Sequence, residues 1–278
     1  KNSGDVFHGN MRLREALYRS VNLVSLRVIL DYGTENAINY VKRFGFDTSA
    51  FPNNVQLAFG GGTIALSPID IATGYTVFAN GGFKVTPFLI QRIDSLNDDV
   101  IFEASPLKAC HQLCPPESTA PQGVEPRVAH IMNSILADAI RRGTGTKALR
   151  ALKRSDLKGK TGTTNNADIW FSGYTHDLVA TAWAGFSDNS PVGSREWGST
   201  VPIETWIDFM SRALPPEADS SLLPRPNGIV SVRIDPKTGL RADPTDPNAI
   251  FEIFREEYAP AENQVKKGED AGPFRQIF

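Results

Sequence analysis

Residues 157–186 read LKGKTGTTNNADIWFSGYTHDLVATAWAGF, and the class of fold can be predicted from this segment. It contains three strand-like runs, at 157–163, 169–174 and 178–186, which are separated by short polar connections. Parallel strands need a long crossover between them, whereas antiparallel strands can be joined by a tight turn. The three runs therefore predict an antiparallel meander.

Helical patterns surround this meander. Upstream, apolar residues recur at helical spacing over 11–32, 34–44 and 128–140, and a further helix starts at Ser67-Pro68, where serine suits the N-cap and proline the first turn. Downstream, residues 203–214 form one more amphipathic pattern. Helices first, then a meander, then a helix again is the order of an α+β domain with helices packed on an antiparallel sheet.

The remaining segments predict smaller features. Residues 83–93 and 100–103 read as a strand pair around an Asn-Asp-Asp turn, and residues 229–234 as one more strand. Prolines at 215, 216, 224 and 226 mark a boundary. We expect one domain over residues 1–216, followed by a Pro-rich linker and a small β-containing tail over 217–278.

Composition excludes several classes of function. The 278 residues carry 29 Lys and Arg against 31 Asp and Glu and contain no basic run, which argues against a nucleic-acid partner. No stretch approaches the roughly 20 apolar residues that span a bilayer, and residues 1–5 lack a signal-peptide core. We expect any membrane anchor to lie outside this chain.

The two cysteines are Cys110 and Cys114, with His111 between them. They read as a short disulfide loop, a partial metal site or two free thiols. An isolated pair lacks the four ligands of a structural zinc site, so the disulfide is favoured and no metal or other cofactor is expected.

The sharpest chemical signal is Lys160-Thr161-Gly162-Thr163-Thr164 on the first predicted strand. Glycine lets a substrate backbone approach the strand edge, and flanking hydroxyls can bind a carboxylate. Lys160 supplies a matching positive charge. The alternative interpretation is an ordinary Thr-rich strand with an exposed lysine.

A second signal is Ser20-Val21-Asn22, which interrupts the helical pattern of residues 11–32. Ser20 and Asn22 are two residues apart and would point to different sides of a continuous helix, so both reach one ligand only if the backbone turns there. Serine and asparagine favour such turns through local hydrogen bonds. Taken alone, the tripeptide is a weak signal, and a helix-breaking cap is the favoured interpretation.

Together, a Ser-x-Asn turn upstream and a Lys-Thr-Gly strand downstream are two of the three motifs of penicillin-binding proteins. The wider sequence resembles the transpeptidase domain of class A, bifunctional members of that family over most of positions 6–210. The stretches that carry this resemblance are 13–27, 66–82, 143–148, 170–174 and 183–186. The resemblance implies that family's fold, an antiparallel sheet with helices on both faces, here incomplete at its N-terminal side.

The third motif, Ser-x-x-Lys, is not found upstream of Ser20. Two such tetrads occur later, at 105–108 and 155–158, but in the wrong order, and the second runs into the Lys-Thr-Gly strand. We expect both to be decoys and the nucleophilic serine to lie on a complementary N-terminal segment outside this chain. The turn at 165–168 is also short for the family, and Gly198-Ser199 replaces a common Gly-Gly pair.

The resemblance implies serine acyl transfer on the D-Ala-D-Ala stem peptides of peptidoglycan, with β-lactams as substrate mimics. Ser20 would relay a proton, Asn22 would hold the substrate amide, and Lys160 would support the relay. Thr163 would grip the substrate carboxylate and supply an oxyanion-hole N–H. The other residues expected to bind substrate or β-lactam are Thr144, Thr161, Gly162 and Thr164.

By the same resemblance, a glycosyltransferase domain and an anchor in the inner membrane would lie upstream, with this chain on the periplasmic face. Two alternatives stay open. One is a DD-carboxypeptidase or β-lactamase on the same scaffold, which the extra residues after Pro224 disfavour. The other is a silent binding or sensor domain that keeps the site without a nucleophile.

Overall fold

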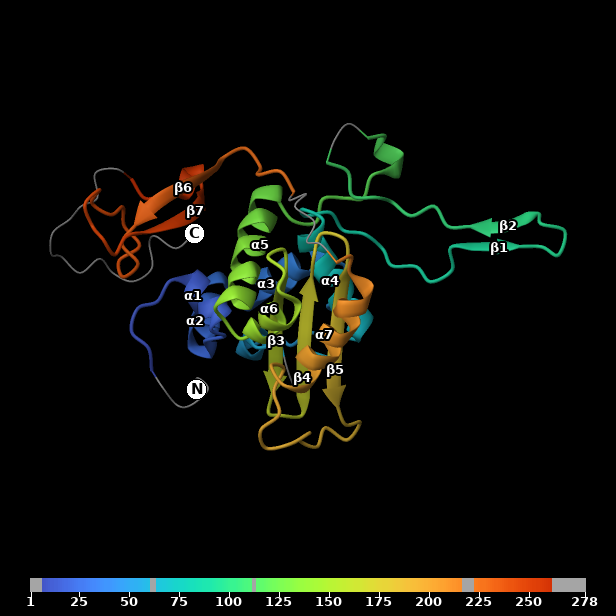
Figure 1. Ribbon diagram of the computed structural model, residues 1–278, viewed down its shortest axis with the longest axis horizontal. Coiled ribbons are helices and arrows are strands. Elements are labelled where there is room, and N and C mark those ends of the chain that lie inside the picture. Colours follow the sequence, from blue (N-terminus) through green and yellow to red (C-terminus); the bar gives the residue numbers. More distant parts are fainter. Residues whose placement is uncertain (1–6, 61–63, 112–113, 217–222, 262–278) are drawn as a thin grey trace.

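The centre of the molecule is a three-stranded antiparallel sheet (Figure 1), in a computed structural model that describes residues 7–60, 64–111, 114–216 and 223–261. Its strands are β3 (Lys158–Thr164), β4 (Asp168–Tyr174) and β5 (Val179–Gly185), in that order across the sheet. The predicted meander is therefore confirmed. Within the described residues β3 is an edge strand, and this leaves the Lys-Thr-Gly sequence at the border of the sheet.

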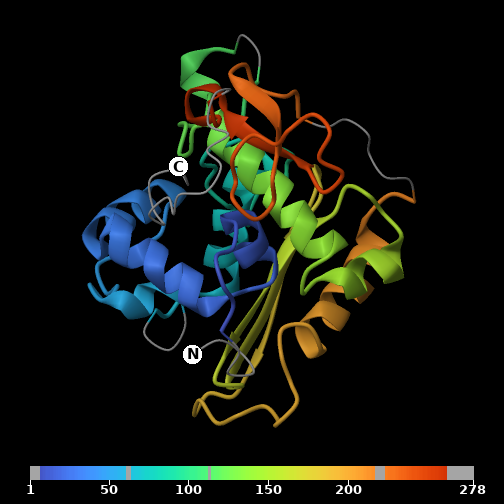
Figure 2. The same cartoon turned by 90° about the vertical axis from the view of Figure 1, so that its left-hand side faces the viewer.

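Helices cover both faces of this sheet, as the resemblance implied (Figure 2). On one face lie α4 (Pro68–Ala79) and α5 (Pro126–Arg141), and on the other α6 (Thr146–Leu152) and α7 (Val201–Ala213). Buried aromatic rings hold each face. Tyr174 of β4 lies 6.0 Å from Tyr75 of α4, and Phe171 of β4 meets Trp206 of α7 edge to face at 5.0 Å.

The N-terminal helical pattern is broken where the sequence indicated. The pattern over 11–32 forms α1 (Leu13–Tyr18) and α2 (Asn22–Tyr32), and the chain turns between them at Ser20. The pattern over 34–44 forms α3 (Thr34–Val41). Ser20 adopts a left-handed conformation with φ 58°, which is uncommon for a residue other than glycine. Short 3₁₀ helices occupy Lys42–Phe44, Val55–Ala58, Pro116–Ser118 and Glu256–Tyr258.

The start of α4 is fastened by a capping box. The Ser67 hydroxyl accepts a hydrogen bond from the Asp70 backbone N–H, and the Asp70 carboxylate accepts one from the Ser67 N–H at 2.9 Å. Both orphan N–H groups are satisfied, so the predicted N-cap is confirmed.

Replacing Ser67 with alanine is expected to lower the free energy of unfolding by about 1 kcal/mol, because the N3 donor loses its acceptor. Urea unfolding followed by far-UV circular dichroism measures this. Ser25→Ala is the control, since Ser25 lies exposed within α2. A loss equal to that of the control would contradict the capping role.

Two predictions about the rest of the chain were incomplete, and one helix was missed. The strand expected over 83–93 is only β1 (Arg92–Asp94), which pairs with β2 (Val100–Glu103) in an arm that projects from the body (Figure 1). Phe83 makes a single bridge to Gln122 instead, and Pro87 has no N–H for a ladder. Helix α6 was not predicted, because its seven residues lack a side-chain cap.

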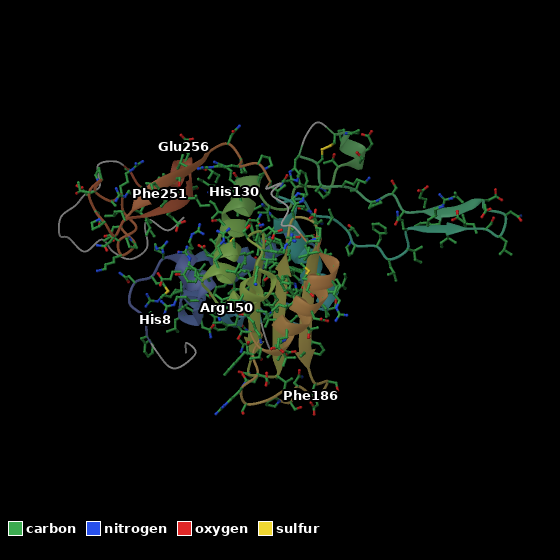
Figure 3. The ribbon with its side chains drawn as sticks, in the orientation of Figure 1. His8, His130, Arg150, Phe186, Phe251 and Glu256 are labelled. Carbon is green, nitrogen blue, oxygen red and sulfur yellow. A yellow bond between two sulfur atoms is a disulfide. The ribbon has the colours of Figure 1, made fainter. Side chains whose placement is uncertain are left out.

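The tail was predicted to contain one strand, yet it forms a hairpin of β6 (Ile229–Ile234) and β7 (Ile250–Arg255). In β7 Glu252 is buried, whereas the neighbouring Phe251 is 76% exposed. Figure 3 labels Phe251 on this hairpin. A charged residue inside and a phenylalanine outside reverse the pattern by which strands are usually recognised.

Within the described residues, no helix combines the length and apolar character that a membrane span requires.

Candidate active site

The Ser20 turn and the edge of β3 meet. The Lys160 ammonium donates a hydrogen bond to the Ser20 hydroxyl over 2.9 Å, although the two residues are 140 positions apart. The turn is held in place because the Ser20 N–H donates to Leu17 at 3.1 Å and the Val21 N–H to Ala16 at 2.9 Å. Uncommon backbone conformations persist only where surrounding structure enforces them, and they cluster at functional sites.

Lys160 is held by a second acceptor, the backbone carbonyl of Thr161, at 2.9 Å. Burial disfavours its charged form and lowers the Lys160 pKa to about 8. A lysine with such a pKa exchanges its proton near neutral pH, which suits a group that supports a serine proton relay.

Lys160 is therefore expected to titrate near pH 8 rather than at the ordinary 10.5. Between these values the unfolded chain keeps a proton that the folded chain has lost, so stability should rise with pH across that window. Reductive ¹³C-methylation and NMR measure the titration. Burial also lowers the Lys158 pKa, so Lys160→Gln and Lys158→Gln assign the signals. A Lys160 signal that titrates only above about pH 9.5 would refute the expectation.

The outer edge of β3 presents backbone groups to the same place. The Thr161 carbonyl is bound by Lys160 Nζ and so points away from β4. In an antiparallel pair, every second residue directs both its N–H and its C=O to the same side. The Thr163 N–H therefore points to this edge as well.

The turn between α5 and α6 completes the border of the site. The Thr144 and Thr161 hydroxyls are 2.7 Å apart, and the Thr144 N–H donates to Tyr18 at 3.3 Å. A Cβ at Gly143 would lie 2.3 Å from the Tyr18 carbonyl oxygen, so only glycine permits this approach. Two neighbouring hydroxyls beside an ammonium can bind a carboxylate.

Gly198 is a site-forming residue that the sequence showed only as a departure from the family pattern. Its N–H donates to the Thr163 hydroxyl at 3.0 Å, and a Cβ there would lie 2.2 Å from the Trp170 carbonyl oxygen. The Thr163 side chain is exposed, and its hydroxyl hydrogen stays available to a ligand. Gly198 also packs closely on the backbone of Gly162, whose carbonyl oxygen would lie 2.6 Å from that Cβ.

Two further expected site residues lie at the ends of neighbouring elements. Asn22 is the exposed first residue of α2, directly after the Ser20 turn. Thr164 is the last residue of β3, and its carbonyl accepts from Ala167 at 2.9 Å in the turn to β4. The described contacts therefore join Ser20, Lys160, Thr161 and Thr144 directly, and leave Thr164 in the strand-closing turn.

The cysteines lie apart from this cluster. Cys110 and Cys114 form a disulfide with their Cα atoms 6.2 Å apart, in the loop that follows β2. Over the described ranges, no three His, Cys, Asp or Glu side chains gather in a way that would hold a metal ion.

Neither Ser-x-x-Lys tetrad of this chain is helical. Residues 105–108 run through a loop, and residues 155–158 lead directly into β3. Ser155 is exposed, whereas Lys158 lies 5.7 Å from the centre of the Tyr174 ring. A serine and a lysine three residues apart share one face only on a helix, so neither pair is built for nucleophilic catalysis.

The left-handed serine turn, the lysine of lowered pKa and the Thr-rich strand edge lie together, as expected for the penicillin-binding class that the two sequence motifs predict. The comparison with known families agrees with this class. Residues 1–192 match the family described as penicillin binding protein transpeptidase domain. The chain belongs to this family of transpeptidase domains.

Individual relatives narrow the similarity to one type of member. The chain is 40% identical to penicillin-binding protein 1A of Pseudomonas aeruginosa, over 98% of this chain and 38% of that protein. It is 34% identical to penicillin-binding protein 1A of Vibrio cholerae, over 94% of this chain and 36% of that protein. The crystal structure of penicillin-binding protein 1A from Haemophilus influenzae superposes with a TM-score of 0.85 at 31% identity, covering 94% of this chain and 42% of that one.

The chain therefore spans somewhat more than a third of the length of these relatives.

Proposed function

We propose that this chain forms one wall of the active site of a peptidoglycan DD-transpeptidase, within a bifunctional cell-wall synthase. The observation that carries the proposal is the hydrogen bond from Lys160 to Ser20, since it unites two motifs that lie far apart in the sequence. Thr144 and Thr161 lie beside this pair and would bind the terminal carboxylate of a stem peptide or a β-lactam.

The nucleophile of this enzyme would come from a helical Ser-x-x-Lys on the polypeptide that precedes residue 1. Neither tetrad within the described residues is helical, which supports an outside source. Ser20 would carry the proton between that serine and the leaving amine, and the Thr163 N–H would bind the oxyanion. The same preceding polypeptide would hold the glycosyltransferase domain and the anchor, with this chain facing the periplasm.

The test uses the intact polypeptide that contains this chain. We expect it to be labelled covalently by a fluorescent penicillin, and the label to be found on a peptide upstream of residue 1. Failure to label would overturn the proposed function, and a label within residues 7–261 would overturn the assignment of the nucleophile.

Transfer and hydrolysis are separated by a second measurement. Release of D-alanine from a stem-peptide substrate is followed with and without an acceptor amine. A transpeptidase forms the cross-linked product when the acceptor is added, whereas a carboxypeptidase releases D-alanine and forms none. Hydrolysis of the β-lactam with fast turnover would instead support a β-lactamase.

A further inference from the structure

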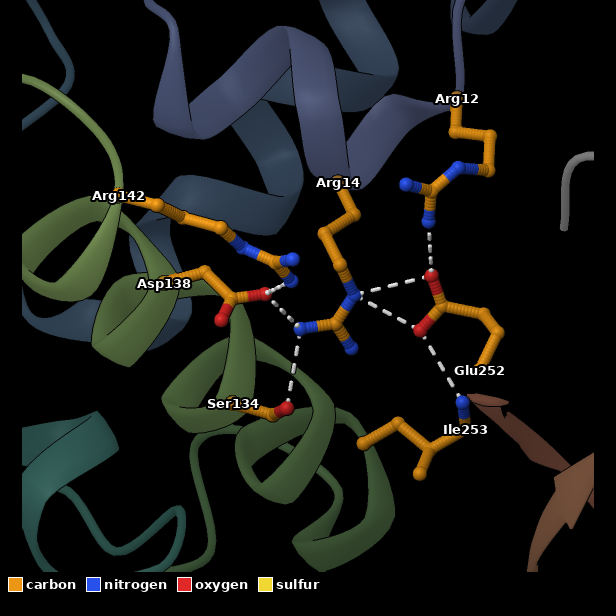
Figure 4. Close-up of polar contacts among 7 residues, drawn as sticks. All are labelled: Arg12, Arg14, Ser134, Asp138, Arg142, Glu252 and Ile253. Carbon is orange, nitrogen blue, oxygen red and sulfur yellow. Dashed lines mark hydrogen bonds and ion pairs between the residues drawn. The ribbon is translucent and has the colours of Figure 1, made fainter. Parts of the chain in front are cut away.

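The C-terminal hairpin of β6 and β7 is joined to α1, the helix that precedes the Ser20 turn, by a buried ionic network (Figure 4). Its centre is Arg14 of α1, whose Nε donates to both carboxylate oxygens of Glu252 in β7, at 2.7 and 3.0 Å. Arg14 Nη1 donates to Asp138 and Ser134 of α5, each at 3.0 Å. The Arg14 side chain is only 8% exposed, so these contacts are shielded from solvent.

Glu252 is itself held from two further sides. Arg12 Nη1, just before α1, donates to it at 2.8 Å, and the Ile253 backbone N–H donates at 3.0 Å. The carboxylate thus accepts from two arginines and one amide and is 89% buried. A buried carboxylate with this many donors is fixed in one position.

Helix α1 needs such support because it is short. It has six residues and no side-chain cap, and isolated helices of this length do not form in water. Its buried contacts are few, with Arg14 and Ala16 as the buried side chains. The position of Ser20, which follows α1 directly, therefore depends on what holds Arg14.

The same network reaches the second border of the active site. Asp138 lies near the end of α5 and also binds Arg142, immediately before the turn that carries Thr144. That turn contacts the end of α1 through the hydrogen bond from Thr144 to Tyr18. Arg14 therefore connects α1, which leads to the Ser20 turn, with the end of α5, which leads to the turn that carries Thr144.

We propose that Glu252 is a positioning residue and that the C-terminal hairpin acts as a brace for the Ser20 turn. Glu252 touches no reacting group, and it sets the place of Ser20 and Thr144 through Arg14. The hairpin is therefore a working part of the transpeptidase site rather than an appendage. This inference rests on the proposed function for its kinetic consequences, but its structural statement stands alone.

The test compares Glu252→Gln with Glu257→Gln in the intact polypeptide. Glu257 is the control because it lies just after β7 and binds Arg127, near the start of α5, at 2.8 Å, in an ion pair that is more exposed than that of Glu252. We expect Glu252→Gln to slow acylation by fluorescent penicillin by about 10²-fold, the typical cost of a displaced catalytic group. The control should stay within about twofold.

A second readout does not depend on acylation. Displacement of the Ser20 turn should open Lys160 to water, so the Lys160 titration measured by NMR should move to higher pH in Glu252→Gln and stay in place in Glu257→Gln. If the wild type does not react with penicillin yet this shift occurs, the proposed function fails and the brace stands.

Two results would overturn the brace. One is an unchanged Lys160 titration in a folded Glu252→Gln protein, and the other is an equal loss of acylation in both variants, which would show a general effect of stability. If Glu252→Gln does not fold, Arg12→Gln removes only the outer contact of the network. It should give a smaller change in the same direction, and no change would count against the proposal.

Discussion

Replacing Ser20 with alanine is expected to slow acylation of the intact polypeptide by labelled penicillin about 10²- to 10⁴-fold, the usual contribution of a positioned proton carrier. The alanine removes the hydroxyl that Lys160 Nζ contacts at 2.9 Å, and leaves the Thr161 carbonyl as its other acceptor. Stopped-flow or quenched-flow labelling measures the second-order rate constant.

The matched control for this experiment is Ser25→Ala, which removes an exposed serine hydroxyl from α2, five residues along the chain. We expect its rate to equal that of the wild type. The melting temperatures of both variants should agree with the wild type, since Ser20 is also exposed. A Ser20→Ala rate within about threefold of wild type would remove Ser20 from the mechanism.

The largest expected effect on stability is that of Trp206→Ala. Trp206 is 1% exposed, packs edge to face on Phe171, and donates a hydrogen bond to the Ala180 carbonyl at 3.1 Å. Truncation leaves a cavity between α7 and the sheet and removes that donor. We expect a loss of about 3–5 kcal/mol in the free energy of unfolding.

Guanidinium unfolding followed by circular dichroism measures the loss. Phe7→Ala is the control, because Phe7 is an aromatic residue that is 80% exposed and its truncation should change stability by less than about 0.5 kcal/mol. Equal destabilisation by the two substitutions would show that the face between α7 and the sheet does not support the fold.

Much of the fold was predictable because local chemistry and tertiary structure agree there. The meander followed from three short strand patterns and tight turns, and α4 from a serine before a proline. The break at Ser20 followed from two turn-forming residues inside a helical pattern. In each case the signal lies within a few neighbouring residues, so the sequence alone carries it.

Other elements could not be predicted because their stability comes from elsewhere in the chain. Helix α6 has seven residues and no cap, and it forms because Ala148 is buried in the core beside α7. Strand β7 hides Glu252 rather than an apolar residue, and only the distant arginines of the α1 region make that burial acceptable.

The class of fold, the family and the two motifs that carry the chemistry could be predicted without coordinates, since these depend on residue type and spacing. The folded arrangement was needed to show that Ser20 and Lys160 touch, that Gly198 packs on Trp170 and contacts Thr163, and that the C-terminal hairpin binds α1 through Arg14. The physical reason is distance along the chain. Local propensity reports on neighbouring residues, whereas these contacts join residues that lie from 28 to more than 200 positions apart and form only when the whole core packs.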